Sequence, residues 1–257
     1  MIIVLAFSAS AHAAGYVYQV NANGHLIVSP NDANTSGYAD LETARTFDHR
    51  ARGPWEAGDT VTLDPTGPGG AVFPTGGLIL PDSPAPMTFT LDGQGAILTF
   101  DVTGNRAIVN VFGSGAQLIN CTLRDVGATG DGPLLDINAV SAAADITDFL
   151  VEDVLIESPP YEAGDSHFIV RVRQDAVDMY TVSGTFRRMI VNLIHAVGYS
   201  DIVGISDLPD GSVSNMDRRG TLNFIDCEVS GSDGTNVGDA ANDCIGVRGT
   251  VDVWVIG

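Results

Sequence analysis

Three arginines lie in strand-like segments where alternation decides which way their side chains point. In the segment Val170 to Arg173 the two valines are expected to face a core, so Arg171 and Arg173 would lie on the outer surface. The same rule, applied to the apolar residues before it, puts Arg248 outside. Guanidinium groups bind carboxylates through a planar fork of N–H donors, so such a cluster would bind an anionic sugar polymer. The alternative is that each arginine pairs with a neighbouring aspartate.

A second candidate for chemistry is the oxygen-rich segment from Asp233 to Asp239. Its side chains are the hard ligands that Ca²⁺ prefers, and a bridging Ca²⁺ is another way to hold an anionic polymer. The segment lacks the residue order of an EF-hand and its bidentate glutamate, so a plain long turn is the favoured interpretation. The chain has no lysine, which excludes Schiff-base chemistry, and no organic cofactor is expected.

Composition places these residues in an acidic, folded, strand-rich chain. The 257 residues are 44% hydrophobic and only 17% charged, which is not the signature of disorder. The formal net charge of −20 argues against nucleic-acid and anionic-membrane partners. The acidic residues are 26 Asp and only 6 Glu, and there are 30 Gly. Asp and Gly favour turns over helix interiors, so many short strands are expected.

The first residues resemble a secretory leader. An apolar run, Ile2 to Phe7, precedes Ala11-His12-Ala13, which has the A-x-A pattern of signal-peptidase sites. We therefore expect a signal peptide over residues 1–13, with part of it missing because no basic residue precedes the run. A single domain over 14–257 would then be secreted, periplasmic or at the cell surface. An N-terminal strand is the alternative, and no segment is long enough to span a membrane.

The next segments predict two short strands at 16–20 and 25–28 and one helix over 38–47, capped by Ser36 or Asp40. A strand at 60–63 follows, and one strand at 78–80 is expected inside a Gly- and Pro-rich stretch.

From residue 87 onward two series of apolar segments recur, and the members of the first series follow one another at steps of 33, 38 and 35 residues. The first series aligns 118–123, 151–156, 189–194 and 224–229. The second aligns 107–111, 134–137, 168–172, 201–205 and 243–247. Repeats of this length with short strands and little helix are typical of a solenoid, in which each coil buries its apolar face against the next. A β-sandwich is the main alternative.

The repeats also predict the state of the cysteines. Cys121 and Cys227 fall at equivalent positions three coils apart, so a strand spacing of about 4.8 Å separates them by roughly 14 Å. A disulfide needs Cα atoms within about 7 Å, so free thiols are expected.

At this point the chain resembles the pectin-lyase-like superfamily of right-handed parallel β-helices, which includes pectate lyases and polygalacturonases. The helix at 38–47 is similar to the family's N-terminal cap, and 57–61 is similar to its first strand, Pro-Gly-Asp-Thr-Ile. The segments 199–205 and 242–249 are similar to the family's Asn-Thr-Asp-Gly-Ile and Asp-Asp-Cys-Ile-Ala-Ile motifs. The resemblance implies an all-β, right-handed parallel β-helix with an N-terminal capping helix.

The resemblance implies two chemistries for one set of residues. In the hydrolase version Asp201 and Asp243 would be the acid and base of glycosidic cleavage. In the lyase version Arg173 or Arg248 would be the base that removes a sugar proton, and Asp201, Asp239 and Asp243 would hold Ca²⁺. Arg171 and Arg173 would contact the polysaccharide in either version.

Several departures keep these alternatives open. Asn242 replaces one of the family's paired carboxylates, and the step from Asp201 to Asp243 is longer than the usual coil. The family's later Gly-His-Gly and Arg-x-Lys segments have no counterpart. The final strand, 251–257, leads us to expect that C-terminal coils and a cap are missing. The function expected is a secreted protein that binds a polysaccharide and, as an enzyme, cleaves it. The alternative is a noncatalytic β-helix used as an adhesin, surface or fibre module.

Overall fold

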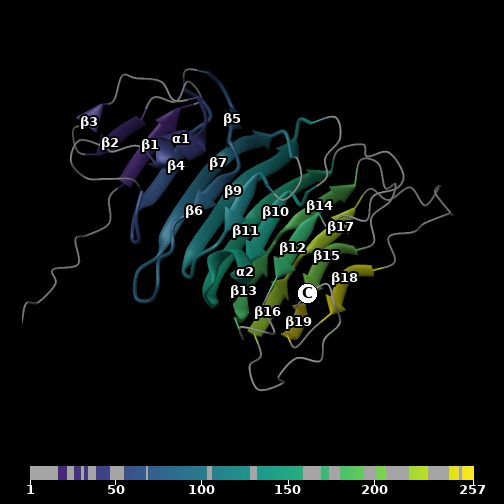
Figure 1. Cartoon of the computed structure of the whole chain (residues 1–257). Coiled ribbons are helices and arrows are strands. Elements are labelled where there is room, and N and C mark those ends of the chain that lie inside the picture. The colour runs from purple at the N-terminus through teal and green to yellow at the C-terminus, as the bar shows by residue number, and fades with distance from the viewer. Residues whose placement is uncertain are drawn as a thin grey trace, which may run out of the picture.

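The computed structural model describes residues 17–21, 26–29, 32–33, 39–46, 55–67, 69–102, 106–127, 132–158, 169–173, 180–193, 201–206, 220–230, 243–248 and 251–257. Almost all of their regular structure is β-strand, and most strands pair in parallel in chain order, as in a solenoid. Figure 1 shows them stacked one after another from β4 to β19. The sequence prediction of an all-β parallel repeat is confirmed at this level, and two facing antiparallel layers are excluded for the described strands.

A six-stranded sheet, here called the short-strand sheet, has the order β18-β15-β12-β10-β8-β6. Its strands are β6 (Leu78–Leu80), β8 (Val109–Val111), β10 (Leu135–Asn138), β12 (Val170–Arg173), β15 (Asp201–Ser206) and β18 (Asp243–Arg248). One row of neighbours across the sheet is Val109, Leu135, Val170, Val203 and Ile245. This register is the one that the second series of repeats predicted.

The other sheet has thirteen described strands and is here called the long-strand sheet. Its repeating strands are β4 (Thr60–Asp64), β7 (Phe89–Phe100), β9 (Ala116–Asp125), β11 (Ile146–Ser158), β13 (Val182–Arg187), β14 (Ile190–Leu193), β16 (Gly220–Ile225), β17 (Glu228–Ser230) and β19 (Val251–Ile256). Strand β5 (Val72–Pro74), which the sequence analysis did not predict, pairs with β7. Strand β11 pairs along its length first with β13 and then with β14, so these two strands are successive arms of one coil.

The alignment of the first series was wrong at its third member. Leu118, Val151, Phe186 and Phe224 form one row, so Phe186 occupies the position assigned to Met189. The true segment is 186–191, three residues earlier than predicted. Met189 and Val191 are themselves buried, so they imitate the apolar positions of the neighbouring coils.

The core between the two sheets is built from rows of equivalent side chains. Phe186 stacks on Phe224 with ring centroids 4.7 Å apart, and Phe149 meets Phe186 edge-on at 5.3 Å. Gly184 leaves room for this stack, because a Cβ there would lie 2.3 Å from the Phe149 ring. Each coil therefore buries its apolar face on its neighbours, which is the main source of stability in a solenoid.

The N-terminal end is closed by strands and one short helix. Strand β1 (Val17–Asn21) pairs in parallel with β4, and β2 (Leu26–Ser29) and β3 (Asp32–Ala33) continue that edge in antiparallel fashion. The helix α1 (Leu41–Thr46) buries Leu41 and Ala44 and is capped by Asp40, as predicted, although it is shorter than 38–47. Glu42 of α1 accepts a hydrogen bond from the Ile79 backbone N–H at 2.9 Å. This bond gives a partner to a backbone N–H of the edge strand β6.

Two further predictions concern the N-terminal segment and the cysteine thiols. The expected signal peptide, residues 1–13, lies outside the described residues. Cys121 and Cys227 are free, as predicted. Within the described part, no helix is long and apolar enough to cross a bilayer.

Candidate functional site

The outer surface of the short-strand sheet carries two of the three predicted arginines, Arg171 and Arg173, and the side chain of Arg248 lies outside the described part of the structure. Val170 and Val172 are fully buried, while Arg171 and Arg173 are partly exposed on the opposite side of β12. The alternation rule therefore placed both arginines on the correct face. We call this surface, with Asn110, Asp136, Arg171 and Arg173, the arginine face.

Arg171 is held by a buried aspartate of the preceding coil. Its Nε and Nη2 donate to the two oxygens of Asp136 at 2.9 and 2.7 Å. The Asp136 side chain is only 1% exposed and that of Arg171 13%. Asn138 donates a further hydrogen bond to Asp136 at 3.2 Å. A buried ion pair of this kind is costly to break, because Arg171 would lose two charge-assisted hydrogen bonds in a poorly solvated place.

The same row continues to Asn110, one coil earlier, which is a neighbour of Asp136 across the sheet. The Asn110 amide donates to the backbone oxygens of Gly77 and Leu78 at 3.3 Å. Asn110 and Asp136 are buried although they lie on the outer face. Sequence reasoning missed this row, yet a signal existed: in the predicted alignment of the second series, Asn110, Asp136 and Arg171 fall at one position.

Arg173 differs from the other arginines whose side chains are described. Each of the others donates a hydrogen bond to a carboxylate or to a backbone oxygen. Within the described part of the chain, Arg173 makes no hydrogen bond or ion pair. Its neighbours across the sheet are Asn138 and Ser206, and Ser206 in turn neighbours Arg248. The backbone thus brings Arg173 and Arg248 into one row, two coils apart.

The two predicted catalytic aspartates are neighbours in the register. Asp201 opens β15 and pairs with Asp243, which opens β18, so their backbones lie about 4.8 Å apart. Asp239, predicted as a metal ligand with Asp243, lies outside the described residues. In the described coils the equivalent strand-start position, two residues before Val109 and Leu135, is occupied by the buried residues Ala107 and Pro133.

The aspartate row and the arginine row lie at opposite ends of their strands. Asp243 and Arg248 are the first and last residues of β18. Five residues of extended backbone span about 16 Å. The side chains of Asp201, Asp243 and Arg248 lie outside the described part of the structure. The backbone alone puts the aspartate row and the arginine row too far apart to act on the same reacting atom.

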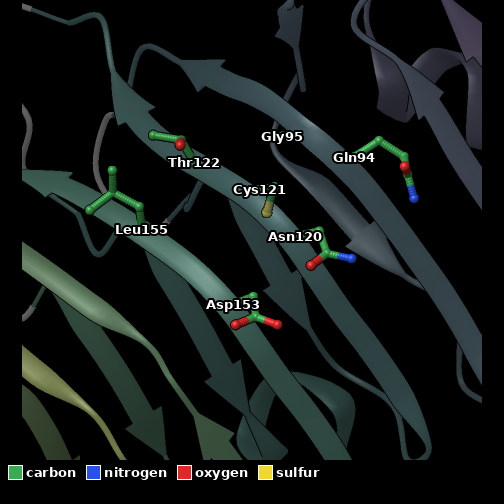
Figure 2. A pocket seen from close by; sticks show the side chains of 7 residues that line it. All are labelled: Gln94, Gly95, Asn120, Cys121, Thr122, Asp153 and Leu155. Carbon is green, nitrogen blue, oxygen red and sulfur yellow. The ribbon is translucent and has the colours of Figure 1, made fainter.

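A separate concavity of about 470 Å³ lies on the outside of the long-strand sheet. We call it the corner groove; Figure 2 shows its lining residues, Gln94, Gly95, Asn120, Cys121, Thr122, Asp153 and Leu155. None of these residues was predicted as functional. The Cys121 side chain is buried beneath the groove, and burial raises the pKa of its thiol, so it is not a nucleophile.

The corner groove follows a row of residues with left-handed backbone. Asn120, Asp153, Arg188 and Asp226 have φ between 49° and 55° and fall at equivalent positions in successive coils. Three of the four are Asn or Asp, the types that adopt this conformation most readily. Each of these residues lies where the chain bends between two strand segments of the same coil. The row therefore marks one corner of the solenoid.

Comparisons of the chain with protein-family models, with curated proteins and with solved structures find no match. Function must therefore be argued from the two surfaces themselves.

Proposed function

We propose that this protein is an exported right-handed parallel β-helix, similar to the pectin-lyase-like family, that binds an acidic polysaccharide across the arginine face. Right-handedness follows the strong rule for crossovers between parallel strands. The observation that carries the proposal is Arg173, which lies on the outer face of a parallel sheet and has no partner among the described residues. On a chain with net charge −20, such an arginine is a specific place for a carboxylate to bind.

The register supports an extended ligand. Arg173 and Arg248 lie two coils apart, roughly 10 Å between backbones, with Ser206 between them. A polysaccharide lying across the strands would present successive carboxylates to this row. Arg171, predicted to contact substrate, would act indirectly here, because its guanidinium is already held by Asp136.

If the protein cleaves its ligand, Asp201 and Asp243 are the residues we assign to the chemistry. Neighbouring coils can supply the carboxyl separation of about 6.5–9.5 Å that an inverting hydrolase needs. The length of β18 argues against Arg248 as a lyase base acting beside these aspartates. Arg248 is therefore assigned to binding.

A cation is compatible with the same aspartates. Two carboxylates on adjacent coils are hard oxygen donors, and Asp201 and Asp243, with Asp239, are the residues that would hold Ca²⁺. Bound there, Ca²⁺ would neutralise a sugar carboxylate. No group of three or more His, Cys, Asp or Glu side chains suited to a metal occurs among the described residues.

The second candidate is a noncatalytic glycan-binding module. It is favoured by Ala107 and Pro133, which are buried at the strand-start position that Asp201 and Asp243 occupy in later coils. Aspartates at such a position would cap turns and would not contact a ligand.

One experiment separates these functions. The full chain is incubated with oligogalacturonate and with neutral oligosaccharides, with and without Ca²⁺. New absorbance from unsaturated products indicates a lyase, new reducing ends alone indicate a hydrolase, and binding without either indicates the noncatalytic module. The proposal expects binding of the acidic glycan, and absence of any binding to it would refute the proposal.

A further inference from the structure

The corner groove exists because one coil carries extra residues. Between the pairs Asp92–Ile119 and Ala96–Cys121, strand β7 has three residues where β9 has only Asn120. The extra residues form a rim along one side of the groove, and Figure 2 shows Gln94 and Gly95 on this side of Asn120. Gly93 permits the close approach, because a Cβ there would lie 2.5 Å from the Cβ of Cys121.

The carboxylates near the groove are already bonded. Asp92 accepts hydrogen bonds from the Gln94 backbone at 3.1 Å, from the Gln94 amide at 2.5 Å and from the Asn120 amide at 3.1 Å. Asp153 accepts two hydrogen bonds of 2.6 Å from Arg188, which lowers the pKa of this carboxyl. Arg188 therefore neutralises Asp153, while Asp92 keeps its charge and would repel an anion. A cation would have to displace the three neutral donors that already occupy the Asp92 oxygens.

What the groove still offers is a set of neutral hydrogen-bonding atoms. Both amides donate to Asp92, which leaves Gln94 Oε1 and Asn120 Oδ1 as acceptors. Within the described residues these oxygens and the Thr122 hydroxyl have no hydrogen-bond partner. Beside them runs an outward row of Ile97, Thr122, Leu155 and Ile190.

We propose that the corner groove binds a neutral, hydroxyl-rich saccharide. Sugar hydroxyls would donate to the amide oxygens and exchange hydrogen bonds with Thr122, and the C–H face of a ring would pack on Leu155. The volume of about 470 Å³ is within the range of about 300–1,000 Å³ typical of small-ligand sites. This site does not depend on the arginine face, and it would take a ligand of different charge.

The test is an NMR titration of the isotope-labelled full chain with three neutral tetrasaccharides, linked through β-1,4 glucose, β-1,4 mannose and α-1,4 glucose. At least one is expected to shift the backbone amides of Gln94, Asn120 and Thr122. Thr122→Val and Gln94→Gly each remove one hydrogen-bonding group, and glycine keeps the left-handed backbone at 94. Each is expected to weaken binding by roughly two- to tenfold.

The matched control is Thr185→Val, on the outer face of β13 and away from the groove. It should leave the affinity unchanged, and thermal melts should show that all three variants are folded and unfold cooperatively. The proposal is overturned if no neutral tetrasaccharide shifts groove amides, if the control weakens binding equally, or if putrescine or tetragalacturonate occupies the groove instead. Each of these results is independent of whether Arg173 binds an acidic glycan.

Discussion

The arginine face and the corner groove each contain an Asp–Arg ion pair, but the two pairs differ in burial and in their effect on the surface around them. Asp136 and Arg171 form a buried, doubly hydrogen-bonded pair, and Asp153 and Arg188 form a pair of the same type on the exposed corner. On the arginine face the pair is structural, and Arg173 beside it has no anionic partner in the described part of the chain. In the corner groove the pair removes net charge from the surface. The comparison shows that which charges are already bonded decides what each surface can bind.

The largest difference between the two regions is expected in stability. Asp136→Asn removes the buried carboxylate charge that Arg171 binds through two hydrogen bonds, which should lower the free energy of unfolding by about 3 kcal/mol. The matched change, Asp153→Asn, removes a charge from the exposed pair and keeps a residue type that tolerates the left-handed backbone. It should have a much smaller effect, because exposed pairs contribute little.

Urea denaturation of both variants measures this difference. Equal effects of Asp136→Asn and Asp153→Asn would show that burial does not separate the two pairs, and the comparison would then lose its basis.

A smaller effect is expected from Gly93→Ala, which tests how the groove is built. The added Cβ would lie 2.5 Å from the Cβ of Cys121 and 2.7 Å from the Asn120 backbone oxygen. The β7 bulge must shift to relieve this contact, at a cost of about 1–3 kcal/mol. Thermal unfolding followed by circular dichroism gives the cost. A melting temperature equal to that of the wild type would contradict the described packing under the rim.

The sequence also predicted the short-strand sheet, which carries the arginine face, more accurately than the long-strand sheet, which carries the corner groove. The short-strand sheet was aligned correctly because its segments keep strict alternation, and the outward positions of Arg171 and Arg173 followed from that rule. The alternative that an outward arginine pairs with an aspartate is confirmed for Arg171. Its particular partner, Asp136, was not identified, since a residue buried on an outer face breaks the alternation rule. The long-strand sheet was misaligned at Phe186 because the corner residue there is Arg188. Asn120, Asp153 and Asp226 mark the other corners by type, and arginine does not.

The third expected effect is a change in the pKa of Asp153. Hydrogen bonds from Arg188 hold the pKa of Asp153 below its usual range. The stability from this pair is therefore present above the unfolded carboxyl pKa of about 3.9 and is lost as the pH falls through the lower folded value. Arg188→Gln should raise the pKa of Asp153, as followed by NMR titration of its carboxyl carbon. An unchanged value would show that Arg188 does not bond to Asp153 in solution.

The smallest effect on stability is expected for Arg173→Gln, which removes no described hydrogen bond and should change the free energy of unfolding by less than about 0.5 kcal/mol. Its effect on binding tests the central claim most directly. Calorimetric titration with oligogalacturonate should show a loss of roughly tenfold or more in affinity, since charge-assisted hydrogen bonds contribute about 1.5–3 kcal/mol. Thr185→Val should bind as the wild type does. Unchanged affinity of Arg173→Gln for the acidic glycan would contradict the claim that the arginine face binds it.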